Sequence, residues 1–208
     1  MSRRQGAAEG PIVAFDFDGT LTYRDSFMAF LGWRSGPVRF AAGLVALAPA
    51  GAAYLADRDR GRIKAAAVGR FLRGLERQAL VRACSEFAQS PLGRRLVRPD
   101  AEHCWQGWRA RGARMVIVTA SPEEVVAPFA ERLGADVLIG TRLRFDADGR
   151  VQGGFEGGNC RGPEKVRRLH DVFGPALHLA AAYGDTAGDR EMLELADVKG
   201  YRVFHQRA

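Results

Sequence analysis

Short apolar runs recur along this chain, and each stops at polar residues or glycine. Three of them predict strands that are buried on both faces, namely residues 12–15, 114–119 and 177–183. Segments of helical character lie between or after these runs, at residues 104–111, 122–133, 163–172 and 190–195. The helix at 122–133 has clear ends, because Pro122 fits its first turn and Gly134 follows its last residue.

Further strands are predicted in the second half of the chain. Residues 137–139 form a short strand, and residues 198–204 supply late strands. Residues 143–145 and 151–155 flank Asp148-Gly149, which indicates a hairpin. Strands that alternate with helices favour a parallel sheet with helices on both faces. The predicted fold class is therefore α/β, with a Rossmann-like core.

Residues 25–96 differ from this pattern and look helical throughout. They are rich in Ala, Leu and Arg and hold few β-branched residues. Breaks are expected near Gly36-Pro37, Pro49, Gly61, Gly74 and Pro91. We interpret this segment as a helical cap (25–96) inserted into a catalytic core made of residues 11–24 and 97–208, after a loose tail at 1–10.

Charge narrows the range of partners. The chain of 208 residues has 31 Lys+Arg against 24 Asp+Glu, a net charge of +7. The positive electrostatic field of such a protein attracts anions, among them phosphate esters, acidic membrane surfaces and nucleic acid. An arginine-rich, solvated surface is an equally good explanation. No Lys/Arg run is interleaved with aromatic residues, so we expect no nucleic-acid partner.

The cysteines and the N-terminus bear on location. Cys84, Cys104 and Cys160 are too far apart to indicate a disulfide framework or a metal site, and reduced thiols fit a cytoplasmic protein. No apolar segment precedes Pro11, so we expect no secretory signal and a cytoplasmic location.

Acids and hydroxyls follow three of the predicted strands. Asp16 and Asp18 come after the first strand, Thr119-Ala120-Ser121 ends the second, and Asp185 and Asp189 follow a later one. Because the carboxyl ends of parallel strands meet at one edge of a sheet, these groups should lie together. Neighbouring carboxylates repel unless a cation neutralises them. A hard cation with oxygen ligands resolves the repulsion, and Mg²⁺ suits phosphate chemistry.

The same edge offers groups that bind phosphate. The hydroxyl of Thr119 can bond a phosphoryl oxygen, and the helix that opens near Pro122 presents free N–H groups. Lys165, early in its own helix, adds a compact positive charge. Each feature alone has a structural explanation: the acids as caps or turns, Thr119-Ala120-Ser121 as an N-cap, Lys165 as a surface lysine. Their ordered combination points to a site.

The full set of motifs resembles the haloacid dehalogenase superfamily, in its phosphatase branch. The matching pieces are D-F-D-G-T-L-T from Asp16, T-A-S from Thr119, a lysine on a helix at Lys165, and Y-G-D-T-A-G-D up to Asp189. They occur in the family's order over most of the chain. The insertion between the first and second motifs resembles the cap of the phosphoserine phosphatase-like subgroup, subfamily IB.

The resemblance implies a role for each matching residue. Asp16 corresponds to the nucleophile that forms an aspartyl-phosphate, and Asp18 to the general acid/base. Thr119, with Ala120 beside it, and Lys165 correspond to phosphate binders. Asp16, Asp18 through its backbone carbonyl, and Asp185 correspond to the family's metal ligands. Asp189 corresponds to a supporting acid, and Asp25 falls where the subgroup often has an acid that contacts substrate.

Departures from the subgroup put phosphoserine in doubt as the substrate. Phosphoserine phosphatase has Ser-Gly-Gly in the second motif and Glu at the substrate acid, whereas this chain has Thr119-Ala120-Ser121 and Asp25. Gly188 also replaces a common Asn. An acid at Asp18 still favours phosphate esters, since a leaving alkoxide needs a proton.

The cap contains an unusually apolar stretch at residues 37–56, in which only Arg39 is charged. Its length approaches the roughly 20 residues of a membrane span, but Pro49 and many small residues argue against one. Packing of cap helices on each other is the favoured explanation. The alternative is a peripheral contact with the inner face of a membrane, or with a lipid tail. The pattern also resembles the phosphatidylglycerophosphatase C type of the same subgroup, so a lipid phosphate is a substrate hypothesis.

Three functions remain open from the sequence. The first is a Mg²⁺-dependent phosphomonoester hydrolase acting on a phosphorylated small molecule or a lipid phosphate. The second is a phosphotransferase that passes the phosphoryl group of the same intermediate to an alcohol. The third is a non-catalytic protein that binds anions or membrane, against which the pair of acids at Asp16 and Asp18 argues.

Overall fold

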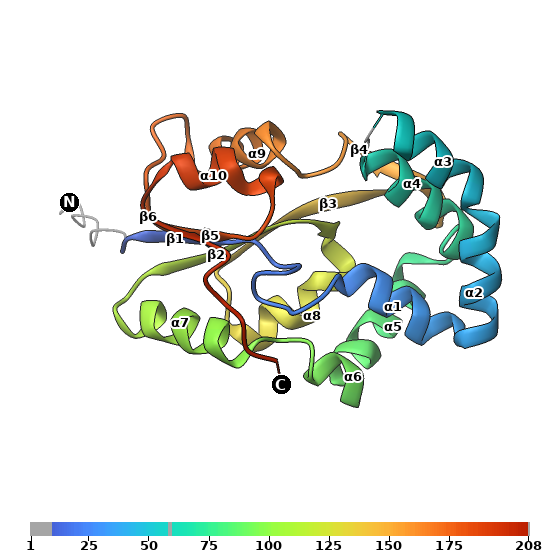
Figure 1. Cartoon of the computed structure of the whole chain (residues 1–208), viewed down its shortest axis with the longest axis horizontal. Coiled ribbons are helices and arrows are strands. Elements are labelled where there is room, and N and C mark those ends of the chain that lie inside the picture. The colour runs from blue at the N-terminus through green and yellow to red at the C-terminus, as the bar shows by residue number, and fades with distance from the viewer. Residues whose placement is uncertain (1–9, 58–59, 208) are drawn as a thin grey trace, which may run out of the picture.

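A six-stranded sheet runs through the centre of the protein (Figure 1). The computed structural model describes residues 10–57 and 60–207. The strands are β1 (Ile12–Phe15), β2 (Arg114–Pro122), β3 (Val137–Phe145), β4 (Val151–Glu156), β5 (Leu179–Gly184) and β6 (Ala196–Tyr201). Their order is β4-β3-β2-β1-β5-β6, and all neighbours are parallel except the antiparallel pair β3 and β4.

Helices cover both faces of this sheet. The longer helices of the α/β alternation are α7 (Pro99–Ala110), α8 (Glu123–Leu133) and α9 (Pro163–Phe173), followed by the short η1 (Ala187–Asp189) and α10 (Arg190–Glu194). In Figure 1, α9 and α10 lie above the sheet, and α7 and α8 lie below it. The predicted α/β class with a Rossmann-like layered core is confirmed.

The central strand β1 sets the position of the site. β1 lies between β2 and β5, with Phe15 level with Ile117 on one side and with Tyr183 on the other. Its residues Val13, Ala14 and Phe15 are fully buried, as expected for a strand covered on both faces. The chain passes from β1 to β2 on one side and from β5 to β6 on the other, so the carboxyl ends of β1 and β5 border a crevice of the kind where α/β proteins bind ligands.

The third strand differs from the prediction of two short pieces. β3 is continuous from Val137 to Phe145, pairing first with β2 and then with β4. Gly140 lies where β3 passes close to Glu123, and its N–H donates to the Glu123 carboxylate at 3.0 Å. A Cβ at this position would lie only 2.7 Å from Cγ of Glu123, so a glycine lets β3 continue past this side chain. The predicted hairpin is present, and Gly149 has the positive φ of 73° that its turn requires.

The helical insertion between β1 and β2 contains six helices among the described residues. They are α1 (Ser26–Ser35), α2 (Pro37–Ala46), α3 (Ala48–Asp57), α4 (Arg60–Phe71), α5 (Arg77–Gln89) and α6 (Pro91–Arg94). The predicted breaks at Pro37 and Pro91 are helix starts. Pro49 instead lies in the first turn of α3, where a missing N–H is tolerated, and Gly61 lies in the first turn of α4.

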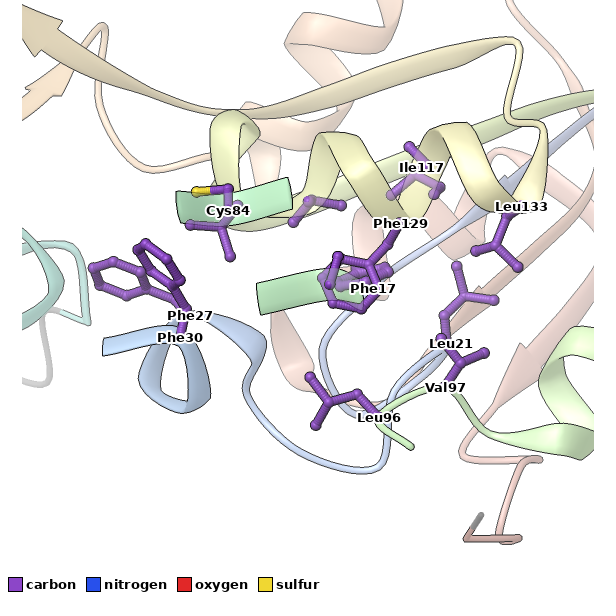
Figure 2. Packing of buried hydrophobic residues seen from close by; sticks show 14 of the residues in the cluster. Phe17, Leu21, Phe27, Phe30, Cys84, Leu96, Val97, Ile117, Phe129 and Leu133 are labelled. Carbon is purple, nitrogen blue, oxygen red and sulfur yellow. The ribbon is translucent and has the colours of Figure 1, made fainter. Parts of the chain in front are cut away.

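A continuous aromatic cluster joins part of the insertion to the sheet (Figure 2). The ring of Phe17 packs on Phe129 of α8 at 5.5 Å between centroids, Phe129 on Phe87 of α5 at 6.0 Å, and Phe87 on Phe30 of α1 at 5.6 Å. Helices α1 and α5 therefore share one hydrophobic core with the sheet. The division of the chain into a core and a cap at residues 25–96 stays a prediction.

The remaining helices of the insertion, α2, α3 and α4, gather at the end of the molecule toward which β3 runs (Figure 1). α4 packs against β4 and thereby attaches this group to the edge of the sheet. None of the helices described here has the length and hydropathy needed to span a membrane.

Candidate active site

A cavity of about 320 Å³ opens at the carboxyl ends of β1 and β5, beneath α4. Its size falls within the range of small-molecule sites. The lining includes the predicted residues Asp16, Asp18, Asp25, Ala120, Lys165, Asp185 and Asp189. Thr119, the eighth predicted residue, lies behind this lining with its side chain fully buried.

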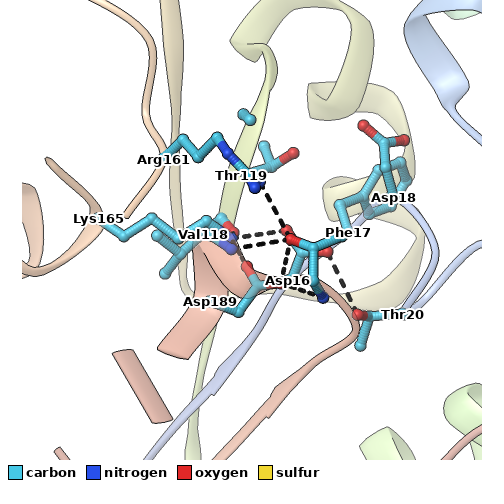
Figure 3. A network of polar contacts seen from close by, with 12 residues as sticks. Asp16, Phe17, Asp18, Thr20, Val118, Thr119, Arg161, Lys165 and Asp189 are labelled. Carbon is cyan, nitrogen blue, oxygen red and sulfur yellow. Dashed lines mark hydrogen bonds and ion pairs between the residues drawn. The ribbon is translucent and has the colours of Figure 1, made fainter. Parts of the chain in front are cut away.

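Lys165 is the centre of a buried network (Figure 3). Its Nζ donates to Oδ1 of Asp16 at 2.6 Å, to the carbonyl of Val118 at 2.6 Å and to Oδ1 of Asp189 at 2.7 Å. The side chain is 1% exposed, so all three of its protons are used inside the protein. Lys165 reaches this position because α9 begins at Pro163 and points its first turn at the end of β1.

Burial and charge act in opposite directions on these groups. Burial raises the pKa of Asp16 to about 7, although Lys165 opposes the rise. Burial alone would lower the pKa of Lys165, but its contacts with Asp16 and Asp189 outweigh this and raise it. Burial would likewise raise the pKa of Asp189, but Lys165 and Thr186 hold it below its usual value. The lysine is charged, and a second cation near Asp16 would favour its ionised form.

Asp189 orients Lys165 from the other side. Its second oxygen, Oδ2, accepts from the N–H of Thr186 at 2.9 Å and from the Thr186 hydroxyl at 3.0 Å. These bonds belong to a capping box at the start of η1. Asp189 is thus fixed by the turn after β5, and the supporting role expected for it stays a prediction.

Asp18 points away from Asp16 and is held by two neighbours. Its Oδ1 accepts from the N–H of Ser26 at 2.7 Å, and its Oδ2 is in hydrogen-bond contact with the hydroxyl of Ser121. Burial raises the pKa of Asp18, and Asp25 raises it further. A carboxyl group with a raised pKa retains a proton that it can donate, as a general acid must.

The carboxylates of Asp16, Asp185 and Asp189 form a cluster that fits a cation. One oxygen from each lies within 4.8 Å of the others. Oδ1 of Asp185 is buried without a hydrogen-bond partner, which is costly unless a ligand satisfies it. Gly19, with a φ of 88°, makes room, because a Cβ there would lie 2.2 Å from Oδ2 of Asp185. The donor set is all oxygen, as Mg²⁺ prefers.

The end of β2, where the sequence predicts a phosphate-binding turn, differs from the prediction in its helix start. β2 extends to Pro122, so α8 begins at Glu123, with Pro122 as its N-cap residue. The hydroxyl oxygen of Thr119 accepts the N–H of Ser121 at 3.1 Å, which shapes the turn at Ala120. Ala120 lines the cavity, close to the start of α8. A direct contact from Thr119 to phosphate stays a prediction.

Asp25 lines the cavity and also caps helix α1. Its Oδ1 accepts the N–H of Met28 at 2.8 Å and caps α1, and its Oδ2 lies 3.5 Å from Nζ of Lys64. Lys64 on α4 also donates to the carbonyl of Ala120 at 3.5 Å. Lys64 therefore connects α4 to the turn at Ala120. Both carboxylate oxygens of Asp25 already have a partner within the protein.

Several residues of the site are absent from the sequence-based prediction. Ser121 does not line the cavity, but it contacts Asp18 and stands in a recognised motif, from which it could have been chosen. Arg161, which donates to the Thr186 hydroxyl at 3.1 Å, lies four residues before Lys165 but carries no motif of its own. Lys64 has no sequence signal, because only folding brings α4 to the cavity. The further lining residues are Gly19, Tyr23, Arg24, Asn159 and Thr186.

The arrangement combines a buried carboxylate at Asp16, a second acid at Asp18 and basic side chains among the lining acids. Asp16 presents its oxygens to the cavity, Asp18 can carry a proton, and Lys165 and Arg161 offset negative charge. Such a set can support nucleophilic displacement at an anionic centre, with protonation of the leaving group.

Comparisons with known proteins agree with this geometry. A family model described as haloacid dehalogenase-like hydrolase matches residues 13–194. Protein CicA of Caulobacter vibrioides is 59% identical over 193 residues, covering 93% of this chain and 86% of CicA.

Solved structures share the fold. A protein of unknown function from Bordetella pertussis Tohama I superposes with a TM-score of 0.73 and 25% identity, covering 90% of this chain and 87% of that one. A substrate-bound phosphoserine phosphatase superposes with a TM-score of 0.63 and 21% identity, covering 94% and 87%.

Proposed function

The chain belongs to the haloacid dehalogenase-like hydrolases, and from this premise we propose that it is a Mg²⁺-dependent phosphomonoester hydrolase that forms an aspartyl-phosphate on Asp16. The observation that carries the proposal is the position of Asp16, which opens into the cavity while Lys165 holds one of its oxygens at 2.6 Å. The fold shared with a substrate-bound phosphoserine phosphatase agrees with this reaction class.

The proposed reaction has two displacements at phosphorus. An oxygen of Asp16 attacks the phosphoryl group, the bond from phosphorus to the ester oxygen breaks, and Asp18 gives its proton to the departing alkoxide. Water then attacks the aspartyl-phosphate, Asp18 takes a proton from it, and orthophosphate leaves as Asp16 is regenerated. Asp18 is suited to both steps because Ser26 and Ser121 fix its carboxyl group at the cavity wall.

Residues of the chain would hold the cation and orient the phosphoryl group. Asp16 and Asp185 would hold Mg²⁺ together with the backbone carbonyl of Asp18, and Asp189 keeps Lys165 in place. When bound, the ion supplies positive charge that offsets repulsion between the carboxylates and a phosphate. Arg161 and the turn at Ala120 are placed to orient the phosphoryl oxygens.

The substrate is proposed as a phosphorylated small molecule or a lipid phosphate, in a cytoplasmic setting. The acid at Asp25 caps α1 and pairs with Lys64, so it is less available to an ammonium group than a free acid would be. This favours phosphate esters other than phosphoserine. The three free thiols at Cys84, Cys104 and Cys160 agree with a reducing compartment.

Replacement of Asp16 tests the proposal. Asp16→Asn should lower phosphate release from p-nitrophenyl phosphate with Mg²⁺ by several orders of magnitude, because the amide oxygen is a poor nucleophile. Asp171→Asn, at an exposed acid of α9, is the matched control and should retain activity. Circular dichroism must show both variants folded, since Lys165 loses a charged partner in the first. A folded Asp16→Asn protein with near-normal turnover would exclude the covalent mechanism.

A further inference from the structure

Helix α2 exposes an apolar stripe to solvent. Only Gly43 of this helix is buried, whereas Val38 is 80% exposed and Val45 is 76% exposed. At 100° per residue, Val38, Ala41, Ala42 and Val45 share one side of α2, which we call the α2 face. A contiguous apolar patch that faces solvent marks a candidate contact surface.

A hollow lined by arginines borders the α2 face. Arg34, Arg39 and Arg70 line it together with Ser35, Ala42 and Phe71 (the arginine hollow). Arg34 donates to the carbonyl of Phe71 at 3.4 Å. Within residues 10–57 and 60–207, no carboxylate is paired with any of these three guanidinium groups.

The segment that carries α1, α2 and most of α3 contributes no acidic residue to this surface. No Asp or Glu occurs between Asp25 and Asp57. The partner that complements both features must therefore present anionic groups at the edge of an apolar layer. A second copy of this chain would bring like charges together, and nucleic acid would leave the α2 face without an apolar partner.

We infer that the α2 face and the arginine hollow form a docking site for the surface of an anionic phospholipid bilayer. Val38 and Val45 enter the boundary of the acyl chains, and the three arginines bind lipid phosphates. The contact is peripheral, because α2 is about 15 Å long and lies along the surface.

This docking site is linked to the active-site cavity by one helix. α4 carries Arg70 into the arginine hollow and Lys64 into the cavity, six residues apart, or about 9 Å along the helix axis. A bilayer bound at the hollow therefore lies near the cap side of the cavity. The docking itself does not depend on the proposed phosphatase activity.

Vesicle binding tests the inference with the full chain. The protein should sediment with phosphatidylcholine vesicles that contain phosphatidylglycerol, and much less with pure phosphatidylcholine. Arg39→Gln with Arg70→Gln should weaken binding about five-fold per arginine removed, and added salt should weaken wild-type binding. Val38→Glu with Val45→Glu should abolish it.

Matched controls separate this surface from general effects. Val172→Glu on α9 and Arg190→Gln on α10 replace exposed residues elsewhere and should leave vesicle binding unchanged. All of these variants should retain their activity on p-nitrophenyl phosphate, because none of these residues lines the cavity.

Three outcomes would overturn the inference. The first is no binding of the wild type to anionic vesicles at low salt. The second is equal binding by wild type and the α2-face variants. The third is a dimer in size-exclusion chromatography that Val38→Glu with Val45→Glu dissolves, which would assign the surface to a second copy. Loss of activity in Asp16→Asn with vesicle binding retained would show that the two proposals stand separately.

Discussion

Asp18 shows how one side chain obtains its chemistry from its surroundings. Its carboxyl group lies two residues after Asp16, yet it bonds to Ser26 and Ser121 instead of Lys165. Burial and the nearby Asp25 raise its pKa, whereas Asp189 next to Lys165 has a lowered one. Two acids of the same type are thereby prepared for different tasks.

Replacement of Asp18 should affect substrates unequally. Asp18→Asn removes the proton donor, so hydrolysis of alkyl phosphates should fall by about 10²- to 10⁴-fold, and hydrolysis of p-nitrophenyl phosphate should fall less. The reason is that p-nitrophenolate leaves without a proton. The comparison is made on kcat for both esters with one enzyme preparation, and equal losses would contradict a general-acid role.

The pair of Glu164 with its arginines predicts a pH effect on stability. Bonds from Arg167 and Arg168, at 2.7–2.8 Å, lower the pKa of Glu164 to about 2. A depressed pKa stabilises the fold above the unfolded value of about 4.5, and this contribution disappears as the pH falls toward 2.

Glu164→Gln should therefore cost about 1 kcal/mol near neutral pH, a modest value because Arg167 is half exposed and solvent screens the pair. Urea unfolding at several pH values measures the difference between variant and wild type. A difference that stays constant from neutral pH down to the acid limit of the fold would contradict the assignment.

At the scale of elements, the start of α1 combines capping with the lining of the cavity. Asp25 accepts the N–H of Met28 at 2.8 Å, and Ser26, the first residue of the helix, donates to Asp18. The N-terminus of α1 thus fixes the candidate acid directly. A change at this helix end is expected to affect both stability and the site.

Two variants of Asp25 separate these effects. Asp25→Ala should destabilise the protein by about 1 kcal/mol through loss of the cap, while Asp25→Asn should be nearly neutral because Asn is also a good N-cap. Urea unfolding gives the free energies. If both variants cost the same, the charge pair with Lys64, and not the cap, carries the contribution of Asp25.

At the scale of the whole molecule, the site depends on strands that are far apart in the chain. Asp16 follows β1, Lys165 stands on α9 and Asp185 follows β5, and the N–H of Asp16 donates to the carbonyl of Tyr183 at 2.8 Å. The acids of this cluster repel one another in the absence of a cation. Bound Mg²⁺ should therefore stabilise the folded state as a whole.

Thermal unfolding measures this linkage without reference to activity. Wild-type protein should gain about 2.7 kcal/mol at a Mg²⁺ concentration of 100 times Kd, seen as a rise in Tm that EDTA reverses. Asp185→Asn should reduce the rise strongly, whereas Asp148→Asn in the hairpin turn should not. An equal Mg²⁺-dependent rise in both variants would place the cation elsewhere.

Local sequence determined the central strands of this protein and the position of its motifs. Apolar runs that stop at polar residues or glycine predicted the strands β1, β2 and β5, because buried parallel strands need continuous apolar residues. The motifs around Asp16, Thr119 and Asp185 stand next to those strands, so their gathering at one sheet edge followed from topology alone. Family membership and fold class followed from the same residues.

Tertiary structure decided what depends on contacts between distant segments. Lys64 and Arg161 have no pattern of their own, and only the packing of α4 and the loop before α9 brings them to the cavity. The double use of Asp25 as cap and lining depends on where α4 places Lys64. The exposure of Val38 and Val45 beside the arginine hollow likewise depends on which side of α2 the fold buries. An apolar sequence with no polar face leaves that side undefined.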